Sequence, residues 1–236
     1  MINGELAEHV AEQRKRPGGR TVALTPDRII EAALRIADAE GDLDRLTVRR
    51  LAAELNVGTM TLYGYFRSRD EILDGMADHA LGRMKLPAEP DSGPAEALRT
   101  VGYAFLAMMR EHPSVARLLA TRVTDSRTAL RGAMEAVLRR LVDAGVPGKI
   151  AVRCYGFLIT YAIGFIGYQT PRPWGALSNA ESIEQRRRRI HFYAGLPSDE
   201  FPLVVRYADA IVDLPSDSQF TAGLEAYIAS TLRELD

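Results

Sequence analysis

The sequence lacks the features that define several protein classes, and each absence excludes one of them. A single cysteine, Cys154, among 236 residues excludes a disulfide framework and a zinc or iron–sulfur site built from cysteines. The longest apolar run, residues 154–168, is shorter than the roughly 20 apolar residues that cross a bilayer, so we expect no membrane partner. No basic segment followed by an apolar run opens the chain, which predicts a cytoplasmic protein without a secretory signal.

Signals for catalysis and for metal or cofactor binding are also missing. The four histidines lack the mutual spacing of metal ligands. No glycine-rich phosphate loop, nucleophile elbow or pair of catalytic carboxylates occurs in the sequence. We therefore expect no metal, no cofactor and no enzymatic activity. An all-α enzyme that uses a C-terminal cavity is the alternative, and turnover of a bound compound would reveal it.

Charge is unevenly distributed along a composition that is otherwise typical of a globular chain. Hydrophobic residues make up 47% and charged residues 26% of the sequence, and the net charge is −1. Residues 14–69 nevertheless hold 11 basic and 7 acidic residues, a local excess of positive charge that attracts a polyanion such as DNA. Residues 1–24 contain Arg14-Lys15-Arg16 and form either a flexible tail or a basic arm that reaches DNA.

The apolar periodicity is helical from residue 26 onward, which predicts an all-α fold. Thr25 and Ser68 have side chains that cap helix starts, and Gly58 lies in a tight turn between two short helices. A helix-turn-helix domain is therefore expected over 25–70, with a long fourth helix that leads into a helical effector-binding and dimerisation domain over 71–236. In that domain, helices are expected at about 95–111, 114–122, 126–144, 148–169, 180–195, 199–213 and 216–235.

Side chains able to contact DNA surround the second helix of this motif. In a helix-turn-helix the second helix lies in the major groove and the first crosses the backbone. Hydroxyl groups bond phosphates or base edges, methionine contacts a thymine methyl, and arginine offers paired donors to guanine or phosphate. A purely structural bundle with solvated polar side chains is the alternative. The expected DNA contacts are Arg49, Arg50, Thr59, Met60, Thr61, Tyr63, Tyr65, Arg67 and Arg69.

Three motifs occur together between residues 46 and 73. A T-x-R-x-L-A-x-x-L-x-V helix begins at Thr47, a T-L-Y-x-Y-F stretch begins at Thr61, and a basic-Asp-Glu-apolar-Leu helix start begins at Arg69. With these motifs the segment resembles the DNA-binding domain of the tetracycline repressor (TetR) family. Residues 220–225 resemble the final helix of its tetracycline-repressor-like branch, whereas the middle of the chain resembles it only in length and helical content.

The resemblance implies a homodimeric transcriptional regulator, usually a repressor that a small molecule releases from an operator of palindromic half-sites. Carried over position by position, Arg49 matches a base-reading arginine, Thr47 joins the DNA-contacting positions, and Arg69 matches a basic phosphate clamp. The chain departs from the family at Gly64, where a bulky residue is frequent, and at Tyr65, where histidine is frequent. The operator of a relative therefore does not transfer to this chain.

Aromatic and methionine residues cluster in the C-terminal domain, as they do in apolar pockets between bundle helices. The resemblance implies an effector site there, although core packing is the simpler explanation for any one of these side chains. A domain that dimerises without binding a ligand is the alternative. The expected pocket residues are Met84, Phe105, Met108, Met109, His112, Phe157, Thr160, Tyr161, Phe165 and Trp174.

Two helices carry the features of a dimer interface. Helix 148–169 is apolar nearly all round, and its glycines recur on a face that another helix can approach closely. The last helix has one continuous apolar stripe, and pairing both helices with their symmetry mates predicts a four-helix interface. The alternative is that both faces pack only within one chain. The expected interface residues are Gly156, Gly164, Phe220, Leu224, Tyr227 and Ile228.

Overall fold

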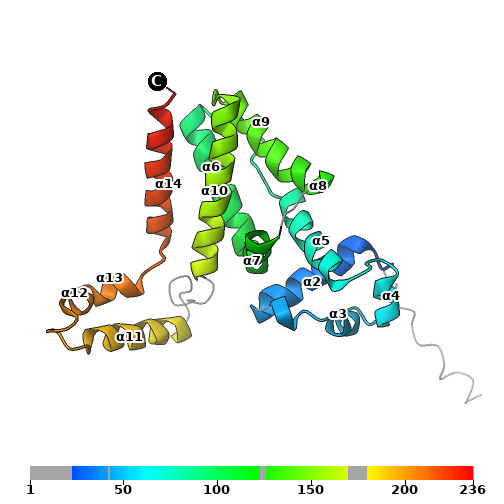
Figure 1. Cartoon of the computed structure of the whole chain (residues 1–236), viewed down its shortest axis with the longest axis horizontal. Helices are drawn as coiled ribbons and strands as arrows, with labels where there is room; N and C mark the ends of the chain where they lie inside the picture. The colour runs from blue at the N-terminus through cyan, green and yellow to red at the C-terminus, as the bar shows by residue number, and fades with distance from the viewer. Residues whose placement is uncertain (1–22, 42, 123–125, 170–179, 236) are drawn as a thin grey trace, which may run out of the picture.

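Helices build the part of the chain that the structure describes (Figure 1). The computed structural model describes residues 23–41, 43–122, 126–169 and 180–235. Within these ranges no strand occurs, which confirms the all-α fold expected from the sequence. Most of the expected basic arm falls within residues 1–22 and Trp174 falls within 170–179, so both lie outside the described residues.

The N-terminal helices form one end of the molecule (Figure 1). Thr25 and Thr47 cap α2 and α3, because each Oγ1 accepts the backbone N–H three residues later, at 3.3 and 3.2 Å. Asn56 adopts a φ of 53° in the turn between α3 and α4, as asparagine tolerates. These local features confirm the helix-turn-helix. Its elements are α2 Pro26–Glu40, the short turn η2 Leu43–Arg45, α3 Val48–Glu54 and α4 Thr59–Tyr63.

Helix α5, Arg69–Gly82, joins this end to the remainder of the chain. Ser68 caps it as the sequence predicts, since its Oγ accepts the N–H of Glu71 at 3.1 Å. The Glu71 carboxylate reaches back to the N–H of Arg67, one residue earlier than in a standard capping box. The start of α5 is therefore fixed directly behind α4.

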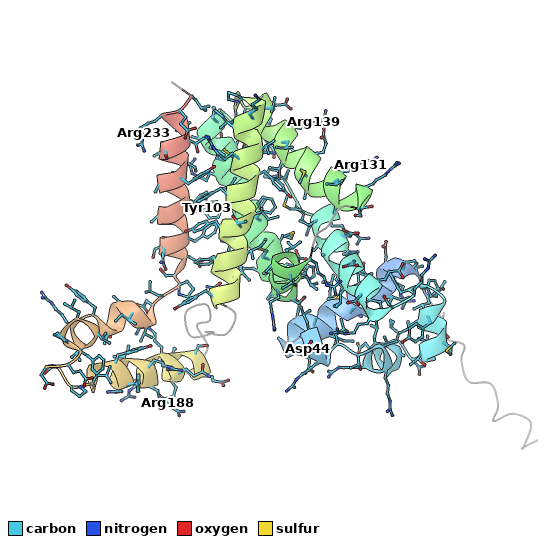
Figure 2. The ribbon with its side chains drawn as sticks, in the orientation of Figure 1. Asp44, Tyr103, Arg131, Arg139, Arg188 and Arg233 are labelled. Carbon is cyan, nitrogen blue, oxygen red and sulfur yellow. The ribbon has the colours of Figure 1, made fainter. Side chains whose placement is uncertain are left out.

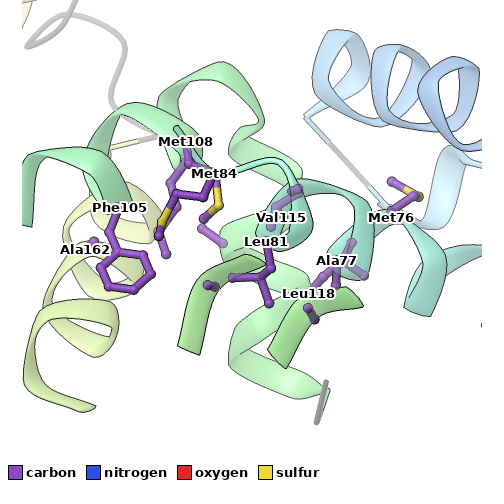
Figure 3. Packing of buried hydrophobic residues seen from close by; sticks show 14 of the residues in the cluster. Met76, Ala77, Leu81, Met84, Phe105, Met108, Val115, Leu118 and Ala162 are labelled. Carbon is purple, nitrogen blue, oxygen red and sulfur yellow. The ribbon is translucent and has the colours of Figure 1, made fainter. Parts of the chain in front are cut away.

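One hydrophobic core runs through both parts of the molecule, from Ile29 in α2 to Ile228 in α14. Figure 3 shows its middle, where Met76 and Leu81 of α5 lead toward Met108 of α6. Because α5 contributes buried side chains to both ends of this core, it is packed along its length. A close-packed helix of this kind transmits strain from one end to the other.

The C-terminal helices agree with the expected ranges except at two places. The expected helix over 126–144 contains a π-helical stretch, η3, where Gly132 lies so close to Gly82 that an added Cβ would be 2.5 Å from its Cα. The expected helix over 199–213 is broken at Tyr207, which leaves helical geometry. The elements are α6 Pro94–Glu111, α7 Pro113–Thr121, α8 Arg127–Ala129, η3 Leu130–Glu135, α9 Ala136–Asp143, α10 Gly148–Gln169, α11 Ala180–Ala194, α12 Pro202–Arg206, α13 Ala208–Val212 and α14 Asp217–Leu232.

The apolar stripe of α14 faces its own chain, which corrects part of the expected dimer interface. Phe220 stacks on Tyr161 of α10 with ring centroids 4.9 Å apart, and Tyr227 stacks on Phe157 at 3.6 Å. Leu224 occupies the space above the Cα of a glycine in α6. Three of the four stripe residues are almost fully buried within one chain, so they are not free to pair with a second copy. The residues to which this correction applies are Phe220, Leu224 and Ile228, whereas Tyr227 is half-buried and its place in the interface stays a prediction.

Helices α11, α12 and α13 pack on one another and project from the body on the side away from α2–α4 (Figure 1). Arg186 pairs with Asp213 at 2.7 Å, and Arg188 pairs with Glu184 at 3.0 Å. Two of the four consecutive arginines at 186–189 are therefore engaged in ion pairs within this projection.

Candidate nucleic-acid interface and ligand cavity

Helix α4 is anchored by one side chain and exposes the others. Leu62 is buried in the core, whereas 79% of Met60 and 47% of Tyr63 are exposed. The threonines at 59 and 61 are exposed as well. Figure 2 draws the side chains of the N-terminal helices and labels Asp44 among them. The helix therefore presents an apolar tip and several hydroxyl groups, which suits contact with base edges and phosphates.

The two arginines at the start of α3 differ in their environment. Arg49 is exposed and has no ion-pair partner among the described residues. Arg50 is held by Glu40 at 2.6 Å, and the same carboxylate accepts a hydrogen bond from Arg45. The hydrogen bond from Arg45, with the charge of Arg50, lowers the pKa of Glu40. Arg49 is thus available to a partner, whereas Arg50 is already paired within the chain.

Two further residues of the expected DNA surface have bonds within the chain. The Arg69 guanidinium donates to the carbonyl of Leu46 at 2.8 Å and to that of Leu43, so it fastens the turn before α3. Two of its three nitrogens are therefore used within the chain, and its expected role as a phosphate clamp stays a prediction. Tyr65 donates its hydroxyl to the Leu24 carbonyl at 3.0 Å, which fixes the chain just before α2.

Thr47 keeps its place at the start of α3 but uses its hydroxyl oxygen as the helix cap. Arg67 has an exposed side chain beside α4. The candidate reading surface that results consists of Arg49, Thr59, Met60, Thr61, Tyr63 and Arg67.

Helix α7 is bonded to α2 at its start and to α5 at its end. At its start, the Asp38 carboxylate of α2 accepts the N–H of Ser114 at 3.0 Å and lies 2.9 Å from Nδ1 of His112. At its end, Arg122 bonds Asp74 of α5 at 2.6 Å and also pairs with Asp70. These charged contacts fix the angle between the two parts of the molecule.

A cavity of about 420 Å³ lies beside this junction. Helix α2 forms one wall, and α5, α6 and His112 form the other. The hydrogen bond to Asp38 raises the pKa of His112, whereas burial, helped by the charge of Arg83, lowers the pKa of His79. The two histidines of the cavity are therefore shifted in opposite directions.

Among the described residues, three of the expected pocket residues line the cavity. Met84, Met108 and His112 line it. Phe105 and Met109 are fully buried core residues. The expected pocket residues are thus divided between this cavity and the core, and their role in binding an effector stays a prediction.

The α10 members of the expected pocket serve other purposes. Phe157, Tyr161 and Phe165 pack against rings of α14, as described above. Thr160 is exposed, and its hydroxyl donates to the Gly156 carbonyl at 2.7 Å. The three aromatic side chains pack between helices, and their place in an effector pocket stays a prediction.

Several residues of the cavity were not expected from the sequence. Arg35, His79 and Lys85 line it beside the methionines. Arg35 lies on the polar side of α2, and a pattern of apolar residues carries no signal for such a position. Only the packing of α2 against α5 and α6 brings these side chains together.

Two features of the described residues bear on other partners. No group of three His, Cys, Asp or Glu side chains in this part of the chain could hold a metal ion. Helix α10 is long and apolar enough to cross a membrane by length and composition. The stretch that meets this test has a mean hydropathy of 1.6, and 33% of it is buried within the chain. An apolar helix with so much free surface requires a cover.

Comparison with known proteins identifies the family. A family model described as the tetracyclin repressor-like C-terminal domain matches residues 86–232, and a model of bacterial regulatory proteins of the tetR family matches residues 29–76. The chain is 38% identical over 167 residues to the HTH-type transcriptional repressor DrrR1 of Streptomyces coeruleorubidus, an alignment that covers 69% of this chain and 61% of that protein. It is 33% identical over 152 residues to an HTH-type transcriptional regulator of Saccharopolyspora erythraea, an alignment that covers 62% of this chain and 61% of that protein. The chain thus spans less than two thirds of the length of these two relatives.

Solved structures agree in fold and in sequence. ActR, a TetR family protein of Streptomyces coelicolor, superposes in its complex with actinorhodin with a TM-score of 0.70 at 32% identity, over 89% of this chain and 96% of that chain. In its complex with (S)-DNPA the TM-score is 0.69 at 32% identity, over 91% and 100%. The sequence, the helix-turn-helix and the C-terminal helices lead to one conclusion: the chain belongs to the tetR family of bacterial regulatory proteins.

Proposed function

We propose that the protein is a cytoplasmic, homodimeric repressor of transcription that binds a specific operator and leaves it when a small-molecule effector binds. The observation that carries the proposal is the α3–α4 unit, which buries Leu62 and exposes Met60, Tyr63 and Arg49. In this unit α4 enters the major groove and α3 crosses the backbone. DrrR1, which is named a transcriptional repressor, supports the direction of regulation.

A second copy of the chain is the proposed cover for the outer face of α10 and α14. An added Cβ at Gly156 or Gly164 would meet nothing within 4 Å, so this face of α10 is open. The outer face of α14 is exposed at Ala222, Ala226 and Ala229. Small residues on both helices allow a symmetry-related pair to approach closely, and a two-fold protein holds two half-sites. This refines the expected interface, which keeps its α10 glycines and loses the buried residues of the α14 stripe.

The effector is proposed to bind the C-terminal domain or its junction with the DNA-binding helices. ActR, whose structures contain actinorhodin or (S)-DNPA, supports a ligand for this fold. A screen of thermal stability checks this point, since a ligand of the native state raises the unfolding temperature with its concentration.

A regulator that dimerises and binds DNA without an effector is the second candidate. It is favoured by the packing of Phe157, Tyr161 and Phe165 against α14, which engages three residues of the expected pocket in contacts between helices. A compound that stabilises the protein and lowers its operator affinity would exclude this candidate.

Selection of DNA fragments by the purified protein, followed by substitution of the two α3 arginines, tests the reading surface. We expect Arg49→Ala to weaken binding of the selected site by about 1–3 kcal/mol and to relax the preference at one base pair. Arg50→Ala removes the same charge from the same helix, but its guanidinium is paired with Glu40. We therefore expect a change of less than about threefold for this control in a gel-shift titration. Equal losses in both variants would mean that charge, and not base reading, is measured.

A further inference from the structure

The junction cavity has the size and the position of a small-molecule site. Its volume of about 420 Å³ falls within the range of cavities that hold drug-sized ligands. Because α2 forms one wall and α5 and α6 form the other, an occupant contacts the DNA-binding helices and the C-terminal domain at once. A molecule in this position is sensitive to the angle between the two parts.

The lining combines an apolar floor with unpaired positive charge. Arg35 and Lys85 are exposed at the cavity and have no ion-pair partner among the described residues. Arg83, in contrast, is paired with Glu31 at 3.2 Å, which neutralises one of the two carboxylates of the lining. Glu111 is the other carboxylate. The floor consists of Leu34, Ala80, Met84, Ala104, Ala107 and Met108.

We propose that this cavity binds an organic anion with an aromatic body, a carboxylate or a sulfonate, and that such anions are the effectors of the protein. The sulfur atoms of Met84 and Met108 favour aromatic rings, and methionine adapts to their shape. The acidic group lies between Arg35, on α2, and Lys85, just after α5. An anion that bridges these two cations sets the distance between the helices that carry them, and His112 of the Asp38 contact lies in the same wall. The effector role rests on the proposed function, whereas the binding site stands on the cavity itself.

A fluorescence titration with anilinonaphthalene sulfonate tests the site, since this aromatic sulfonate brightens in apolar surroundings. The neutral compound phenylnaphthylamine has the same rings without the sulfonate and serves as the comparison. We expect Arg35→Gln and Lys85→Gln each to weaken binding of the sulfonate about fivefold, and to leave the neutral probe within about twofold. Ala107→Phe, at an exposed position that points to the cavity, is expected to abolish binding of both probes. Arg233→Gln, at the far end of α14 in Figure 2, is the control and is expected to change neither.

The outcomes separate the cavity from the proposed function. If Ala107→Phe binds the sulfonate as well as the unmodified protein does, or if the charge variants affect both probes equally, the inference is overturned. A protein that binds the probe as expected but retains no operator DNA overturns the proposed function and leaves the site in place. Saturating operator is expected to change the affinity for the sulfonate, because coupling between two ligands is reciprocal. An unchanged affinity would overturn the effector role.

Discussion

An arginine on the outer face of α10 or α14 is expected to convert the protein to monomers and to lower its operator affinity by about 100-fold or more. Gly164→Arg and Ala226→Arg both lie at exposed positions, so the fold of one chain has room for them. In a symmetric interface each introduced arginine lies close to the same arginine of the second copy, and the like charges repel. Each unpaired charge that is taken from water costs the dimer several kcal/mol of stability. A monomer holds one half-site and loses the effective concentration of the second, which accounts for about 100-fold or more. Sedimentation equilibrium and a gel-shift titration measure the two effects.

Val142→Arg provides the matched control for this experiment. Val142 is 48% exposed on α9, away from the proposed interface, and receives the same charge. It is expected to remain dimeric with unchanged operator affinity. Dimers of Gly164→Arg with full affinity would place the interface elsewhere, and recovery of the unmodified protein with lipid vesicles would make a bilayer the cover of α10.

The local chemistry of the helix ends made the DNA-binding part predictable from the sequence. Thr25, Thr47 and Ser68 each cap a helix in the structure, as their position before an apolar repeat indicates. The turn at Asn56 and the buried Leu62 follow from the same short-range rules. Such signals depend on residues within one helical turn, so no tertiary information is needed to find them.

The partner of a buried face was not predictable in the same way. The stripe of α14 indicates that one face is covered, but periodicity does not say whether the cover is α10 of the same chain or a second chain. Phe220 packs within the chain because α10 supplies an aromatic ring beside it. Leu224 packs within the chain because α6 has a glycine at the same level. Arg69 shows the same limit, since the two carbonyl groups that it binds come from a turn 23 and 26 residues earlier.

The Asp38 contact joins two parts of the chain that are 74 residues apart, and protonation controls its strength. Asp38 raises the pKa of His112, so the charged pair is complete below about pH 6.5 and is lost as the pH rises through the folded-state pKa. Glu111 also raises this pKa. His79 on α5 is a nearby titrating group, and its lowered pKa gives it the opposite dependence, because its protonation opposes folding.

Asp38→Asn isolates the histidine contribution, because asparagine keeps the acceptor for Ser114 and removes the charge that faces His112. We expect the variant to lose about 2 kcal/mol of unfolding free energy near pH 6, the value of a hydrogen bond between charged groups, and clearly less near pH 8.5. Urea denaturation of both proteins at the two pH values gives the difference in their unfolding free energies. His79 is present in both proteins, so its own contribution cancels from this difference. Asp199→Asn, at an exposed position in the projecting segment, is expected to cost little at either pH. Equal losses near pH 6 and near pH 8.5 would mean that His112 does not change its charge in this range, and the contact would then act through its geometry alone.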